Sequence, residues 1–117
     1  MNASAAYMGE QDLIYMTGGL SSQISNKVFS YNRKTDKWKE IASLLNARMG
    51  HCTVAVHGRL YVLGGLNENS SAVNTCERYD CILGRWMFCA PMHRSRTSFA
   101  CAALGRYFIH FIYNFNF

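Results

Sequence analysis

The chain has 117 residues, half of them hydrophobic and 16% of them charged, with one proline and a formal net charge of +5. This composition excludes a disordered chain, which would be poor in apolar residues and rich in charge. No stretch approaches the roughly 18 uncharged apolar residues of a membrane helix, and the N-terminus does not read as a secretory signal. The moderate charge, with acidic residues among the basic ones at 27–40, does not indicate a nucleic-acid partner.

Short β-prone runs follow one another along the chain, separated by Asn, Asp and Gly residues that favour turns. No run keeps an apolar stripe with helical spacing beyond two turns. Residues 3–8 could form one more strand, although no arginine precedes them as it precedes the later copies. The strands are expected at 13–16, 27–31, 38–41, 52–56, 60–63, 75–79, 86–89 and 100–104.

A repeat of about 48 residues explains the order of these strands. Each copy has a glycine pair after one strand, and in each a Tyr precedes a Trp by seven residues and the Trp precedes an Arg by ten. Four short strands and a glycine pair in each repeat are typical of a β-propeller blade. The predicted structural anchors of the repeat are Gly18, Gly19, Tyr31, Trp38, Gly64, Gly65, Tyr79 and Trp86.

The stretch from Arg48 to Gly65 and the stretch from Tyr79 through Trp86 to Arg96 resemble the kelch repeat. The resemblance implies an all-β fold, a partial kelch β-propeller with one complete four-stranded blade and two incomplete blades. A repeat incomplete at its N-terminal strand is expected at 1–46 and a complete one at 47–94. Residues 95–117 would begin a further repeat.

The third copy departs from the pattern after Gly105, because Phe111 and Ile112 stand where its glycine pair should fall. We therefore expect residues 107–117 not to form a strand pair but to be the divergent tail of a truncated product, with genuine divergence as the alternative. A propeller needs about four to eight blades to close. The isolated chain is thus expected to be marginally stable or to need other chains.

The sequence contains no recognisable catalytic residues, metal ligands or cofactor-binding motif. The acidic residues are scattered, the four histidines fall at unrelated repeat positions, and no helix follows a glycine pair as a phosphate-binding loop would require.

The five cysteines lack the spacing of a zinc site and fit buried thiols in a reducing, cytoplasmic compartment. Cys76 and Cys89 take the places of Val28 and Ile41 in the repeat and are expected to pack as ordinary strand residues. Cys81, in a predicted turn between two arginines, is a candidate reactive thiol.

In kelch proteins, the loops after the glycine pair and the loops leading into the innermost strand tend to share the face that holds protein partners. The arginines among them would favour an acidic or phosphate-bearing peptide, although Arg48 and Arg96 could instead be structural anchors. The candidate partner-binding residues are Ser21, Ser22, Gln23, Asn46, Arg48, Asn67, Glu68, Asn69, Arg94 and Arg96.

The resemblance implies a non-catalytic protein-interaction module. Many kelch-like proteins carry a BTB domain and act as substrate adaptors of cullin-RING ubiquitin ligases. This chain shows no BTB or BACK part, so it would reach that machinery only through domains absent from it. An actin-binding or cytoskeletal role is the second expectation, and an enzyme domain built on a propeller is the third.

Overall fold

The computed structural model describes residues 3–9, 11–56, 58–97, 100–104 and 108–112. Within these ranges every regular element is a five-residue β-strand. The strands are β1 (Ser4–Met8), β2 (Leu13–Thr17), β3 (Val28–Asn32), β4 (Lys37–Ile41), β5 (Cys52–Val56), β6 (Arg59–Leu63), β7 (Cys76–Asp80), β8 (Arg85–Cys89), β9 (Ala100–Leu104) and β10 (Phe108–Ile112).

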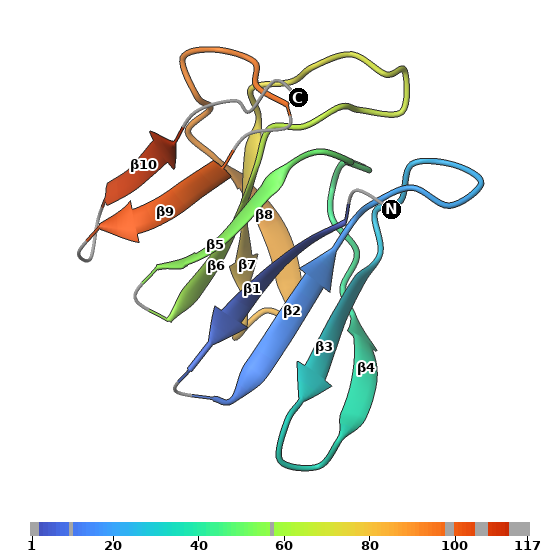
Figure 1. The fold of residues 1–117 in the computed structure, drawn as a ribbon, viewed down its shortest axis with the longest axis vertical. Helices are drawn as coiled ribbons and strands as arrows, with labels where there is room; N and C mark the ends of the chain where they lie inside the picture. Colours follow the sequence, from blue (N-terminus) through green and yellow to red (C-terminus); the bar gives the residue numbers. More distant parts are fainter. Residues whose placement is uncertain (1–2, 10, 57, 98–99, 105–107, 113–117) are drawn as a thin grey trace.

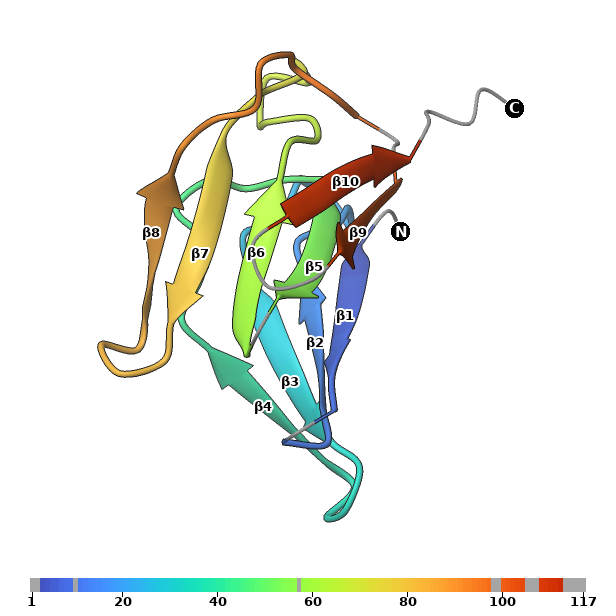
Figure 2. The same cartoon turned by 90° about the vertical axis from the view of Figure 1, so that its left-hand side faces the viewer.

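The strands form antiparallel sheets in sequence order, β1 to β4 and β5 to β8, with β9 and β10 paired as a third. The first strands β1, β5 and β9 run side by side in the same direction (Figure 1). From them each four-stranded sheet spreads outward to β4 or β8 (Figure 2). These sheets are arranged as the blades of a β-propeller, which confirms the predicted all-β, partial propeller.

Two details of the prediction are wrong. Residues 4–8 do complete the first sheet, in register from Ser4↔Thr17 to Met8↔Leu13, so the chain forms two four-stranded blades rather than one. Residues 108–112 do pair with 100–104, although no glycine pair ends that strand. Ladder pairing needs only the backbone N–H and C=O groups, so neither the missing arginine nor the missing glycines prevent it.

The hairpin between the third and fourth strands has the same construction in both blades. The Asn32 Oδ1 atom accepts hydrogen bonds from two backbone N–H groups of the turn, and Asp80 Oδ1 does the same 48 residues later. The turn ends with positive φ at Asp36 and at Gly84. Asx residues stabilise turns in this way without help from tertiary contacts.

The glycine pairs lie where the chain passes close to the next repeat. The Gly19 N–H donates to the Arg48 carbonyl at 2.8 Å, and the Gly65 N–H donates to the Arg96 carbonyl at 2.7 Å. All four glycines have positive φ. A Cβ on Gly18 would lie 2.5 Å from the Arg48 carbonyl oxygen, so both the conformation and the close approach require glycine.

The main core lies between the two blades. Trp86 on β8 is 2% exposed, and its indole N–H donates to the Ala42 carbonyl of the first blade at 2.9 Å. Tyr15 and Val28 of the first blade and Leu60 of the second are buried in the same cluster. Burial of apolar side chains from both sheets holds the blades at a fixed angle and so fixes the connecting loops.

Candidate functional site

The loops that join β2 to β3, β4 to β5, β6 to β7 and β8 to β9 lie at one end of the blades, which we call the loop end; Figure 1 shows them at the top and right. Two adjoining pockets of about 610 and 230 Å³ lie there and share Ala47, Glu68 and Asn69. The larger pocket is also lined by Ser21, Ser22, Gln23, Ile24, Ser25, Asn26 and Lys27, and the smaller by Leu45, Asn46, Asn67 and Val73.

Local hydrogen bonds hold these loops in shape. In the loop from β6 to β7, Asn67 Oδ1 accepts the backbone N–H groups of Asn69 and Ser71, and Ser70 has positive φ. Farther along, the Val73 N–H donates to the Gly65 carbonyl. The lining side chains are therefore carried by a backbone whose conformation is set without a partner.

Seven of the ten predicted partner-binding residues line these two pockets. Seven further lining residues of the same loops are not among the predicted ten: Ile24, Ser25, Asn26, Lys27, Leu45, Ala47 and Val73. Their position beside the predicted loop residues was the signal that could have found them. The seven predicted residues are Ser21, Ser22, Gln23, Asn46, Asn67, Glu68 and Asn69.

Arg48 lines neither pocket, and its side chain is 0% exposed. The guanidinium donates to the Glu77 carboxylate at 3.0 and 3.1 Å and to the backbone carbonyls of Gly64 and Thr75 at 2.9 Å. Of the two roles left open by the sequence, the structure therefore assigns Arg48 the structural one, and its place among the partner-binding residues was wrong. A buried guanidinium needs this full set of acceptors.

Glu77 is a second fully buried charge that the sequence did not single out. Besides pairing with Arg48, its carboxylate accepts the backbone N–H groups of Leu45 at 2.6 Å and Asn46 at 3.1 Å. Both residues line the smaller pocket. Glu77 thus positions part of the pocket wall although it does not line it. The first repeat has Phe29 at this place, so the repeat gave no signal for it.

Arg94 and Arg96 lie in the connection from β8 to β9 and line neither pocket. Arg94 is exposed and Arg96 half-buried. The Arg96 N–H donates to the carbonyl of Val73, which lines the smaller pocket. The connection that carries both arginines therefore passes beside the rim of that pocket.

His51 occupies a buried position between the blades. Its Nε2 atom lies 2.6 Å from the Thr17 hydroxyl, which in turn lies 2.8 Å from the Thr53 hydroxyl. Burial, together with the positive charge of Arg48, lowers the pKa of His51 to about 4. The ring is therefore neutral at pH 7, and it contributes to packing rather than to a charged binding surface.

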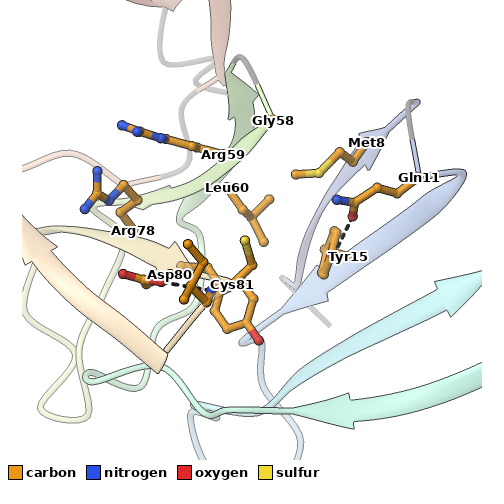
Figure 3. A pocket seen from close by; sticks show the side chains of 11 residues that line it. Met8, Gln11, Tyr15, Gly58, Arg59, Leu60, Arg78, Asp80 and Cys81 are labelled. Atoms are coloured by element: carbon orange, nitrogen blue, oxygen red, sulfur yellow. Dashed lines mark hydrogen bonds between the residues drawn. The ribbon is translucent and has the colours of Figure 1, made fainter. Parts of the chain in front are cut away.

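A third pocket, of about 160 Å³, lies at the opposite end of the blades (Figure 3). The hairpin turns lie at this end, which we call the turn end. Met8, Gln11 and Tyr15 of the first blade line this pocket together with Leu60 and Cys81 of the second. The volume is below the roughly 300 Å³ at which pockets for small organic ligands begin. Cys81, the candidate reactive thiol, is exposed at this pocket.

Within the part of the chain that the structure describes, Cys52 differs from the expectation of simple buried thiols. Cys76, Cys81 and Cys89 are free, whereas Cys52 takes part in a disulfide. The spacing of cysteines in the sequence carries no information about that pairing, because it depends on which strands the fold brings together.

Among the residues that the structure describes, no three His, Cys, Asp or Glu side chains come together as a metal site would require. Within the same ranges, no helix has the length and apolar character needed to cross a membrane.

Residues 11–45 and 47–93 match the family described as the kelch motif. The chain is 31% identical to Kelch-like protein 41a of Danio rerio over 93 residues, which cover 78% of this chain and 15% of the relative. It is 46% identical to Kelch domain-containing protein 7A of Mus musculus over 71 residues, 60% of this chain and 8% of the relative. With human Kelch-like protein 23 it shares 37% identity over 82 residues, 68% and 14% of the two chains.

A solved structure, that of YjhT, superimposes with a TM-score of 0.80 over 89% of this chain and 41% of the other, at 19% identity, and this likeness concerns the fold. The chain spans less than a fifth of the length of the curated relatives described above. The family match covers most of both four-stranded blades, including the glycine pairs and the Tyr–Trp pairs. The chain therefore belongs to the kelch-repeat family, and its fold is part of a kelch β-propeller.

Proposed function

We propose that this chain is a non-catalytic protein-interaction module that binds a segment of another protein at its loop end. In the longer proteins of this kind, the same module would recognise the substrate of a cytoplasmic cullin-RING ubiquitin ligase. The kelch-like relatives support a protein partner. The observation that carries the proposal is the gathering of loop side chains from both blades around the two adjoining pockets.

The chemistry of the lining suits a polar, extended protein segment. Hydroxyl and amide groups such as those of Ser22, Gln23 and Asn69 can both donate and accept hydrogen bonds. The pockets span loops of both blades, so one bound segment would contact both. Loops fixed by a rigid scaffold are the usual place for such recognition.

The acidic character proposed for the partner rests on the exposed Arg94, since Arg48 is buried. Glu68 lines both pockets, and Lys27 is already paired with Glu40 at 3.3 Å. An acidic group of the partner would therefore lie toward the β8–β9 connection, away from Glu68. Charge complementarity of this kind sets the orientation of a bound segment.

Quantitative affinity enrichment with the purified chain tests the binding proposal. The bait is compared with E68R/N69A, which changes two lining residues shared by the pockets, and with K34E/T35A, which changes two exposed residues at the turn end. We expect at least one protein that E68R/N69A loses by tenfold or more and that K34E/T35A retains. Circular dichroism checks that both variants keep the β-sheet signal.

Loss of the same protein with K34E/T35A, or its retention by both variants, would contradict binding at the loop end. The ligase part is tested separately, on a partner identified in this way. Inhibition of cullin-RING ligases in cells should raise the steady-state level of that partner. An unchanged level would overturn the adaptor role and leave the binding site in place.

A further inference from the structure

Two cysteines face each other across the outer strands of the second blade. Cys76 on β7 and Cys89 on β8 are direct partners in the antiparallel register. Their sulfur atoms lie 2.7 Å apart and share a hydrogen bond. A disulfide bond is about 2.05 Å long and bridges Cα atoms roughly 4.4–6.8 Å apart, a range that includes directly opposed residues of antiparallel strands.

The first blade shows what this position needs for packing alone. The corresponding pair is Val28 and Ile41, which are also direct cross-strand partners. Val28 is buried and Ile41 packs against the same core cluster. An aliphatic pair therefore satisfies the fold at this place, and two thiols are not needed to build the strand pair. The chain thus contains its own apolar version of the site.

We propose that Cys76 and Cys89 form a redox-active pair that a peroxide closes into a cross-strand disulfide between β7 and β8. The Cys89 thiolate attacks one peroxide oxygen; an S–O bond forms, the O–O bond breaks, and one water leaves after protonation. The Cys76 sulfur then attacks the Cys89 sulfenic acid, so that the S–S bond forms, the S–O bond breaks and a second water leaves. The two thiols lose two electrons, and hydrogen peroxide gains them.

The surroundings of the two sulfurs distinguish their roles. Cys76 is buried and Cys89 is half-buried, so Cys89 is the sulfur that a small oxidant reaches. The hydrogen bond with Cys76, and then the positive charges of Arg78 and Arg48, lower the pKa of Cys89. The same hydrogen bond, with burial, raises the pKa of Cys76. Cys89 therefore becomes the thiolate that attacks, and Cys76 the thiol that resolves the sulfenic acid.

The exposed Cys81 provides a built-in comparison. It lies in the turn between β7 and β8, and no other free cysteine is its cross-strand partner within the part of the chain that the structure describes. General access to oxidant would favour Cys81, whereas the proposed pair favours Cys76 and Cys89. The product of oxidation therefore separates proximity from exposure.

Peptide mapping of the whole chain tests the proposal. The chain is fully reduced, freed of reductant, treated with one equivalent of hydrogen peroxide, alkylated and cut with trypsin. Cleavage after arginine places Cys76, Cys81 and Cys89 on separate peptides, residues 60–78, 79–85 and 86–94. Among products that contain Cys76, Cys81 or Cys89, we expect the linked peptide 60–78/86–94 to dominate, at least tenfold above any product that contains Cys81.

The variant C76V/C89I copies the aliphatic pair of the first blade, so it should fold and yield no such link. The variant C81S should yield the link unchanged. Oxidation should also slow amide hydrogen exchange of residues 85–89 by tenfold or more in the parent chain, because the crosslink ties β8 to β7, and should not slow it in C76V/C89I. Cys76 and Cys89 that stay alkylated after Cys81 is oxidised would overturn the proposal.

Discussion

Arg48 shows how one side chain can join several parts of this fold. It lies in the loop that enters the second blade, and its guanidinium is shared between the Glu77 carboxylate and two backbone carbonyls. Glu77 in turn accepts N–H groups from the loop that leaves the first blade. Both charges are fully buried, so each depends on the other for its partners. Removing one member of such a pair leaves an uncompensated charge in the interior.

We predict that E77Q lowers the free energy of unfolding of the chain by about 3 kcal/mol, since it leaves the Arg48 charge buried without its counter-ion. The matched control is E40Q, which breaks the exposed pair between Lys27 and Glu40. That change should cost less than about 1 kcal/mol, because water screens exposed ion pairs. Urea unfolding followed by circular dichroism measures both, and equal losses would show that burial does not decide the strength of the pair.

His51 makes the stability of the chain depend on pH. Its pKa is about 4 in the folded chain against an ordinary value of 6.5, so the unfolded chain binds a proton between these values that the folded chain does not bind. The stabilisation from neutral His51 is complete above pH 6.5 and decreases as pH falls toward 4, by up to about 3 kcal/mol. The variant H51Q keeps a polar atom near Thr17 but does not titrate.

Urea midpoints measured from pH 7 to pH 4 for the parent chain and for H51Q test this expectation. The difference between the two curves isolates His51 from the carboxylates that titrate in the same range. The parent should lose more stability than H51Q as the pH falls. Parallel curves would mean that His51 is protonated as easily in the folded chain as in the unfolded one.

Each blade has a row of neighbouring side chains that crosses its strands at the same position of the repeat. The two rows have different surroundings. In the second blade the row contains Leu60 and Trp86, which pack against the first blade and are only 1% and 2% exposed. In the first blade the row runs from Tyr7 to Trp38, which are 50% and 56% exposed. The same sequence pattern therefore gives a buried wedge where a neighbouring blade covers it and an open face where none does.

This difference can be read from fluorescence, because the chain has two tryptophans. The variant W38F retains Trp86, which should emit at short wavelength and resist quenching by acrylamide. The variant W86F retains Trp38, which should emit near the wavelength of tryptophan in water and be quenched readily. Similar emission from both variants in the folded state would contradict the packing of Trp86 between the blades.

The strands could be predicted from the sequence because each repeat combines β-prone runs with turn residues at fixed spacing, and the same spacing placed the loops. The contacts of Glu77 could not be predicted, because its counterpart is Phe29 and no repeat pattern marks it. The burial of Arg48 could not be predicted without the fold, because an arginine that recurs in each repeat can be either a surface residue or a buried structural anchor. The strand at 108–112 does not follow from the repeat pattern, because the glycine pair that ends the corresponding strand in the other copies is absent there.

The sequence contains the information needed to predict that Cys76 and Cys89 lie opposite each other. The repeat aligned them with Val28 and Ile41, and the register of one hairpin would have placed each pair opposite. The alignment gave the positions, and only the pairing of strands turns two positions into a contact.

At the scale of the whole molecule, the loop end, the turn end and the outer face of the first blade differ in what they expose. The loop end gathers polar side chains from both blades, the turn end holds a small pocket, and the face with Trp38 is uncovered. Repeats of this kind gain stability from each neighbour that they contact. We therefore still expect the isolated chain to be of low stability, as its sequence indicates, and a sharp cooperative thermal transition of the purified monomer would overturn this.

The central claim is that a protein partner binds at the loop end, and site-specific photo-crosslinking tests it most directly. A photoreactive residue is placed at Asn69, which lines both loop pockets, or at Leu83, which is 57% exposed at the turn end. With a partner enriched by the parent chain, the account predicts a crosslinked complex from position 69 and none from position 83. A crosslink from position 83 without one from position 69 would contradict it.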